Sequence, residues 1–307
     1  PIPEAYPVGQ MNIDAYPMVG LAAALLLTGG ALATGLLTLR EVPFLRQHAS
    51  APAAFNLRLI FQDLIRALKN GQFALIFVIV IMISAIGGTT TNLGLYMNTF
   101  FWGFDTDDLR WFSLSAVGAV IAFPLIALIQ RRWEKKQIIL LCALISLVDG
   151  IILINLRFLD VLPQNGDPLL LVILVSMGVV AVAIAVVQGV ISASLLADVL
   201  DQHELETGYR QEGMFNAALS FSGKAVSGVG IVLGGLIITL IEFPLQTAPD
   251  MVPENIIFRL GLVVGVLLPL LYLIPIALVT RLNITEAVHA DIRAQLDERY
   301  QAKQSEG

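Results

Sequence analysis

Seven long apolar segments constrain the fold of this chain more than any other feature of its sequence. Each could cross about 30 Å of hydrocarbon as a helix that rises about 1.5 Å per residue. None alternates apolar and polar residues with a period of two, which excludes an outer-membrane β-barrel. We therefore predict an all-α, polytopic membrane protein with seven transmembrane helices, at Tyr16–Leu39, Phe73–Phe101, Trp111–Ile129, Gln137–Leu156, Pro168–Ala197, Met214–Ile241 and Ile256–Thr280.

The overall composition supports a chain that is solvated by lipid. Of its 307 residues, 57% are hydrophobic and 14% are charged, whereas a soluble domain has roughly 25% charged residues. This deficit of charge excludes a soluble enzyme and a disordered chain. The net charge of −6 and the lack of a basic patch exclude a nucleic-acid partner.

The distribution of basic residues predicts how the helices are oriented. Alternate connections hold 14 of the 18 lysines and arginines, which indicates that these connections are cytoplasmic. The N-terminus is then outside and the C-terminus inside a plasma (inner) membrane. Because Pro1 begins an outside segment without a signal peptide, we expect earlier helices of the same protein to precede it.

Four regions follow from these segments. Residues 1–39 form an external segment and one transmembrane helix, and residues 73–280 form a six-helix bundle. Residues 40–72 form a cytoplasmic loop, in which Phe55–Asn70 has the helical periodicity of an amphipathic surface helix. Residues 281–307 form a cytoplasmic tail.

Lys224 is the strongest candidate for a functional residue, because it lies near the middle of a membrane-spanning segment. A charge at that depth costs at least about 2.5–3.5 kcal/mol, so it needs a protein or water environment and a partner. Asn216, Ser220 and Ser227 fall within about 80° of Lys224 on a helical wheel, which predicts a polar stripe along a cavity. The structural alternative is a lysine that only joins helices through a buried pair.

Other polar residues in the apolar segments are weaker candidates. Asp149 could pair with a cation or face an outer vestibule. Asn92 and Tyr96 share a face that follows a weak point at Gly87–Gly88, where a broken helix could form a binding site. Alternatively, this face packs on a neighbouring helix. Gln188 lies one turn before Ser192 and forms a smaller polar pair with it.

An acidic run that includes Asp198, Asp201 and Glu204 follows the fifth apolar segment. A pair of carboxylates could hold Mg²⁺ for group transfer, form salt bridges that close a cytoplasmic gate, or belong to a solvated loop. The metal site would need a second acidic cluster, which no other cytoplasmic connection contains. We therefore favour the gate.

The stretch Leu196–Gly228 resembles the signature of the glycoside–pentoside–hexuronide:cation symporters, the melibiose-carrier branch of the major facilitator superfamily. In that family, A-D-x-x-D-x-x-E ends one helix, T-G-x-R-x-E-G follows, and the next helix has a central lysine. The matching residues are Ala197, Asp198, Asp201, Glu204, Thr207, Gly208, Arg210, Glu212, Gly213 and Lys224. Weaker similarity covers Gly9–Asn12, Tyr96 and Leu296–Tyr300.

The resemblance implies that the seven segments are helices 6–12 of a twelve-helix carrier, of which this chain is a C-terminal fragment. It places Lys224 beside sugar and cation sites that are built mostly from acids in earlier helices. It also implies a cytoplasmic gate, which we assign to Asp198, Asp201, Glu204, Arg210 and Glu212. The sequence departs from the family at Gly189, where sugar carriers have an aromatic residue, and at Gln202, which replaces a tyrosine.

We therefore predict a cation-coupled secondary active transporter of a sugar or related small solute that works by alternating access. It would be driven by Na⁺ or H⁺, with no catalytic residue, resident metal or cofactor. One alternative is a seven-helix retinal photoreceptor or receptor with Lys224 as the Schiff base, although retinal proteins use the last helix. Another alternative is an intramembrane Mg²⁺-dependent transferase built on Asp198 and Asp201.

Overall fold

The computed structural model describes residues 16–43, 68, 71–208, 212–244, 251–282 and 286–305, and these residues form helices without any strand. The chain divides into two compact units, one ending at Leu57 and the other beginning at Arg58. The first contains α1 (Tyr16–Leu37), whose residues are exposed, and the short helix η3 (Leu39–Glu41). The amphipathic helix predicted at Phe55–Asn70 lies outside the described residues, apart from Leu68.

The second unit contains the other helices, several of which join end to end. Seven helical stretches of the described residues are long and apolar enough to span a membrane, which confirms the predicted number. The helices of the second unit are α4 (Gly71–Tyr96), η4 (Met97–Phe101), α5 (Thr106–Leu109), η5 (Arg110–Ala116), α6 (Val117–Ile129), α7 (Lys135–Phe158), α8 (Pro168–Thr207), α9 (Glu212–Leu240), α10 (Glu254–Leu262), η7 (Val263–Leu267), α11 (Leu268–Val279) and α12 (Glu286–Ser305).

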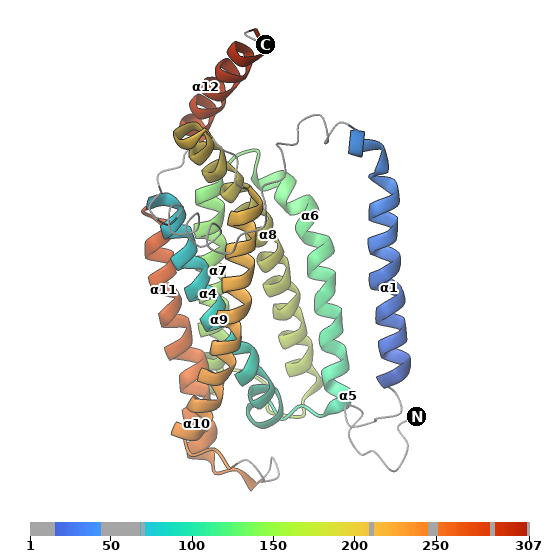
Figure 1. The fold of residues 1–307 in the computed structure, drawn as a ribbon. Coiled ribbons are helices and arrows are strands. Elements are labelled where there is room, and N and C mark those ends of the chain that lie inside the picture. Colours follow the sequence, from blue (N-terminus) through green and yellow to red (C-terminus); the bar gives the residue numbers. More distant parts are fainter. Residues whose placement is uncertain are drawn as a thin grey trace. The chain divides into compact units, whose positions relative to one another are not determined.

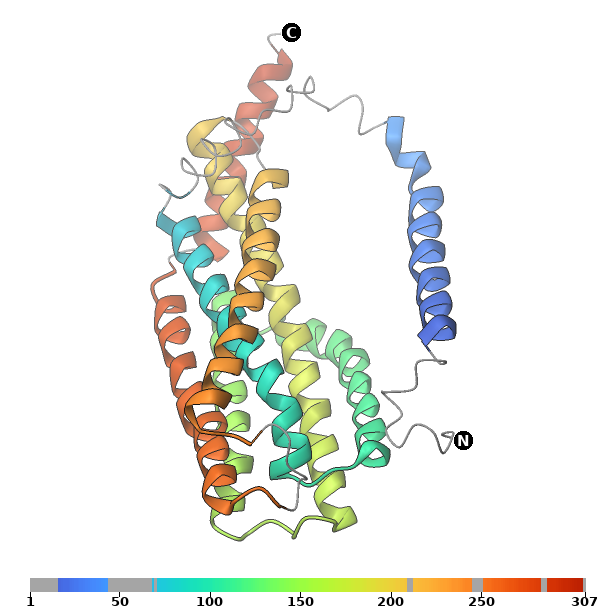
Figure 2. The same cartoon turned by 60° about the horizontal axis from the view of Figure 1, so that its bottom comes forward.

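Neighbouring helices in the second unit follow the order α9, α4, α11, α7, α8 and α6. Figure 1 shows these helices running roughly parallel, and α4 and α9 lie side by side there and in Figure 2. We call the end at which α8 ends and α12 begins the tail end, at the top of Figure 1, and the opposite end the far end. Each end has an apolar core, with Phe73 and Phe215 in contact at the tail end and Leu93 and Leu260 buried at the far end.

The contact between α4 and α9 is made largely of backbone. A Cβ atom on Gly88 would lie 2.2 Å from the carbonyl oxygen of Ser227, and one on Gly230 would lie 2.3 Å from that of Ala85. The hydroxyl oxygen of Thr89 lies 2.9 Å from the carbonyl oxygen of Gly230 across the same contact. Glycine therefore allows a close approach that any larger side chain would block.

Helix α8 is longer than the predicted apolar segment. Its start is capped by Asp167, whose carboxylate accepts a hydrogen bond from the N–H of Leu169 at 2.8 Å. At its other end, Gly208 adopts a left-handed conformation with φ of 79°, and its N–H donates to the carbonyl of Glu204. The acidic run after Ala197 is therefore the last part of this helix, and the alternative of a solvated loop does not hold for these residues.

A side-chain hydrogen bond joins α7 to the last membrane-spanning helix. Pro269 has no N–H to donate to the carbonyl four residues earlier, which is that of Gly265. The side-chain amide of Asn155 donates to this carbonyl at 3.2 Å. The π-helical turn η7 lies at the same place, so the irregular backbone has a polar partner on α7.

Candidate functional site

Lys224 lies on the exposed side of α9, together with Asn216 and Ser220. The helix packs mainly on α4, and this packing leaves the polar stripe uncovered within the unit, with Ser227 half-buried at its edge. Asn216 donates its side-chain amide to the carbonyl of Glu212 on its own helix at 3.0 Å. Lys224 forms no ion pair with any residue that the structure describes, so the alternative of a buried pair is not found there.

Asn92 and Tyr96 pack inside the unit. The side-chain oxygen of Asn92 is buried at the α4–α9 contact, where a Cβ atom on Gly234 would lie 2.6 Å from it. The ring of Tyr96 meets that of Phe243 edge-on, with 5.3 Å between centroids. The structure therefore separates these two residues from the exposed stripe around Lys224.

Helix α4 is continuous through Gly87–Gly88, so the predicted break at these glycines was wrong. The hydroxyl groups of Thr90 and Thr91 donate to carbonyls one turn earlier on the same helix, at 2.9 and 2.8 Å. The irregular turn of this span is instead the π-helix η4, which begins at Met97. Internal hydrogen bonds thus keep the glycine pair helical.

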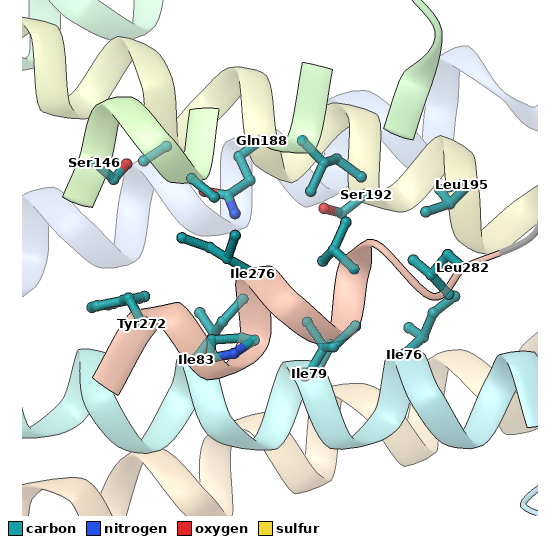
Figure 3. A pocket seen from close by; sticks show the side chains of 16 residues that line it. Ile76, Ile79, Ile83, Ser146, Gln188, Ser192, Leu195, Tyr272, Ile276 and Leu282 are labelled. Carbon is teal, nitrogen blue, oxygen red and sulfur yellow. The ribbon is translucent and has the colours of Figure 1, made fainter. Parts of the chain in front are cut away.

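Gln188 and Ser192 line a cavity of about 310 Å³ between α4, α7, α8 and α11, which we call the inner cavity. Most of its wall is aliphatic, and Figure 3 shows Ser146 and Tyr272 together at one end of it, with Leu195 and Leu282 at the other. The predicted polar pair therefore borders a largely apolar space. The labelled wall residues are Ile76, Ile79, Ile83, Ser146, Gln188, Ser192, Leu195, Tyr272, Ile276 and Leu282.

Asp149 lines a second cavity of about 570 Å³ nearer the far end, which we call the outer cavity. The two cavities share Ser146 and Tyr272 in their walls. One carboxylate oxygen of Asp149 is buried and has no hydrogen-bond partner among the described residues. The sequence identified this acid, but it could not show which helices surround it.

Three acids of the acidic run, Asp198, Asp201 and Glu204, are buried on one face of α8 at the tail end. The ammonium group of Lys135, at the start of α7, donates to both carboxylate oxygens of Asp198, at 2.8 and 2.7 Å. Such a bidentate contact compensates a buried carboxylate for its lost hydration. Glu212 is exposed in the first turn of α9, and Arg210 lies outside the described residues.

The tail helix α12 supplies the other partners of these acids. The ring nitrogen Nε2 of His289 lies 3.4 Å from a carboxylate oxygen of Asp198 and 3.1 Å from one of Asp201. Arg293 lies 3.6 Å from Asp201, and the hydroxyl of Tyr300 donates to Glu204. With the carboxylates of Asp198 and Asp201 occupied by basic groups, this cluster does not resemble a Mg²⁺ site.

Our sequence analysis missed these basic and hydroxyl partners. A signal for them existed, because His289, Arg293 and Tyr300 are spaced by four and seven residues and share one helical face. Asp198, Asp201 and Glu204 also share a face. The complementary spacing could have suggested that the two helices meet.

Comparisons with known proteins agree with this architecture. The family described as MFS/sugar transport protein matches residues 2–286. An uncharacterized symporter of Synechocystis sp. is 33% identical over 156 residues, which cover 46% of this chain and 26% of the relative. These findings point to a transporter and not to an enzyme, and they support a multi-pass membrane protein. Because the match covers most of its length, the chain belongs to the MFS sugar transport family.

Proposed function

We propose that this chain supplies the last seven helices of a cation-coupled secondary transporter for a sugar or a related small solute. The observation that carries the proposal is the exposed Lys224 on a membrane-spanning helix, which forms no ion pair with a described residue. Membership of a sugar transport family supports the class of solute, and the Synechocystis relative named as a symporter supports coupling. The coupling ion would be Na⁺ or H⁺.

The position of Lys224 explains why further helices are required. A lysine in hydrocarbon is costly, so its exposed face must meet protein or water in the working carrier. In our proposal, this face borders the solute pathway between two helix bundles, and an acid from the other bundle balances the charge. Asn216, Ser220 and Ser227 would then lie along the pathway, whereas Asn92 and Tyr96 support the helix behind it.

The tail-end cluster is our candidate for the cytoplasmic gate. Alternating access requires contacts that form when one side closes and break when it opens. Asp198, Asp201 and Glu204 on α8 form such contacts with α7 and α12, and α9, which carries Lys224, follows α8 in the chain. We assign Arg210 and Glu212, which follow in the sequence, to the same gate.

Uptake driven by an ion gradient tests the proposal. In the complete carrier, Lys224→Met should lower solute uptake into proteoliposomes at least about tenfold, the effect of about 1.4 kcal/mol. Lys224→Arg should recover part of the activity because it restores the charge. The control is Arg132→Met, which removes an exposed cation outside the membrane-spanning helices.

The assay uses an imposed Na⁺ or H⁺ gradient and a panel of labelled monosaccharides, disaccharides and glycosides. Equal uptake by the carrier and its Lys224→Met variant would contradict the role of this lysine. Uptake that does not respond to either gradient would contradict the proposed coupling.

A further inference from the structure

Asp149 lies in the outer cavity without a hydrogen-bond or ion-pair partner among the described residues. One of its carboxylate oxygens is buried, and no described residue donates a hydrogen bond to it. The residues that line the cavity include no lysine, arginine or histidine that could balance its charge. A buried polar atom without a partner requires a physical explanation, such as a bound ion, a proton or ordered water.

Side chains with neutral oxygen atoms line the same cavity as this carboxylate. Ser146 lies three residues before Asp149 and therefore on the same face of α7, and Tyr272 on α11 and Asn98 on η4 line the same cavity. In the part of the chain that the structure describes, none of these three side chains has a hydrogen-bond partner. Their oxygens are therefore free to bind a ligand inside the cavity.

The packing of α7 on α11 brings together the helix faces that carry Asp149 and Tyr272. A Cβ atom on Gly150 would lie 3.4 Å from the ring of Pro269, so the helices touch directly beside Asp149. Tyr272 follows Pro269 by three residues and projects from the same side of α11. The carboxylate, the serine hydroxyl and the tyrosine hydroxyl thus come from two helices that are fixed against each other.

The charge of the cavity selects the kind of ligand. A single carboxylate among neutral oxygens is balanced by one monovalent cation, whereas a divalent ion would leave an uncompensated positive charge inside the membrane. Carboxylate, hydroxyl and amide oxygens are the ligands of hard cations. The candidates are therefore monovalent metal ions such as Na⁺ and Li⁺, which would displace a proton from the acid.

We propose that Asp149, Ser146 and Tyr272 form a binding site for one monovalent cation inside the six-helix bundle. Lys224 does not line the outer cavity, so this site differs from the pathway proposed along α9. The proposal needs only that the chain spans a membrane. Since its test measures binding to the chain itself, a failed uptake assay would leave it standing.

The test uses the whole chain in lipid nanodiscs. Addition of NaCl or LiCl to a weakly buffered sample should release about one proton per chain, with choline chloride as the control for ionic strength. Infrared difference spectra should show a protonated carboxyl group that disappears on addition of Na⁺ or Li⁺. If the group titrates with pH but ignores both metal ions, Asp149 is a buried protonated acid without a cation site, and the proposal is overturned.

Single substitutions test whether the proton release and the carboxyl band come from Asp149. Asp149→Asn should abolish both proton release and the carboxyl band, and Ser146→Ala and Tyr272→Phe should each weaken apparent cation affinity by about threefold or more. The matched control is Asp160→Asn, an exposed acid whose positive φ of 56° asparagine also tolerates. A well-folded Asp149→Asn protein with unchanged signals would overturn the proposal, and so would the absence of both signals from the unsubstituted chain.

Discussion

At the end of α8, individual side chains compensate buried carboxylates. Asp198 and Asp201 each expose 8% of their side chains, and such carboxylates destabilise a fold unless cations compensate them. Lys135 provides this compensation for Asp198 through two short hydrogen bonds. Its own side chain is only 23% exposed, so water screens this pair weakly.

Replacing Lys135 by methionine tests the strength of this contact. Methionine keeps the aliphatic stem but removes the ammonium group, so among the described residues Asp198 would retain only the more distant His289. We expect the free energy of unfolding to fall by about 1.5–3 kcal/mol, the usual loss for a hydrogen bond to a charged group. The measurement is the denaturation midpoint in mixed micelles. An equal effect from Arg132→Met, whose side chain is exposed, would contradict the assignment.

Residue-level reasoning from the sequence found the acids but not their partners. Asp198, Asp201 and Glu204 stand out because their spacing follows one helical face after an apolar segment. Their partners in α12 are about 90 residues away in the chain, and periodicity within one helix contains no information about such a distance. For the same reason, helical-wheel geometry could not show that Asn92 faces a glycine of α9.

At the scale of whole helices, the α4–α9 contact is possible because glycine residues have no Cβ atom there. Gly88 lies against the backbone of Ser227, and Gly230 lies against the backbone of Ala85. Gly87, the immediate neighbour of Gly88, has open space where its Cβ atom would be. Two adjacent glycines in one helix therefore have different physical roles.

This difference predicts opposite effects of alanine at the two positions. Gly88→Ala should destabilise the protein by about 1–3 kcal/mol, because the added methyl group would force the helices apart. Gly87→Ala should be neutral or stabilise it by up to about 1 kcal/mol, because alanine favours a helix more than glycine does. Thermal unfolding of both variants in the same detergent measures the difference. Equal gains in both would show that helix propensity, and not the close contact, determines stability, and equal losses would contradict the different roles of the two glycines.

The existence of the membrane-spanning helices could be predicted from the sequence, because apolar length and bilayer thickness determine them directly. Their ends were less predictable. Helix α8 continues through charged residues to Thr207, since Lys135 and α12 neutralise those residues in the folded state. A prediction from hydropathy ends a helix at the first cluster of charged residues. It takes no account of residues on other helices that neutralise those charges.

At the scale of the whole second unit, hydrogen bonds between several helices stabilise the tail end. Lys136 donates to the carbonyls of Thr280 and Leu282 at 2.7 and 2.6 Å, which joins the start of α7 to the end of α11. Helix α12 then reaches back to α8, where Arg299 donates to the carbonyl of Leu205 at 3.0 Å. The last helix of the chain therefore stabilises helices that precede it by many residues.

Two truncations test this role of α12. A chain that stops after Ile284 loses every contact between α12 and α8, and its unfolding midpoint should fall clearly because Asp201 and Glu204 lose their α12 partners. A chain that stops after Tyr300 keeps those contacts and should unfold like the unshortened chain. Circular dichroism during heating in mixed micelles provides the comparison. Equal midpoints for the two truncated chains would contradict a stabilising role for α12.

The neighbours of each helix could not be predicted from the sequence. Hydropathy identifies apolar segments, but lipid-facing and protein-facing residues are equally apolar, so it does not show which face meets which helix. Asp149 illustrates the limit, because its cavity is formed by segments as distant in sequence as Thr90 and Tyr272. Only the three-dimensional arrangement shows which side chains with neutral oxygens line the same cavity.

The bond from Asn155 to the carbonyl of Gly265 has a consequence for how this protein can change over time. The amide and Pro269 are complementary, because the proline withholds a donor that the asparagine replaces. Loss of the asparagine alone would strand a carbonyl in an apolar setting, and loss of the proline alone would add a competing donor. The two positions are therefore epistatic, and a compensatory double substitution is the easier evolutionary route away from this pair.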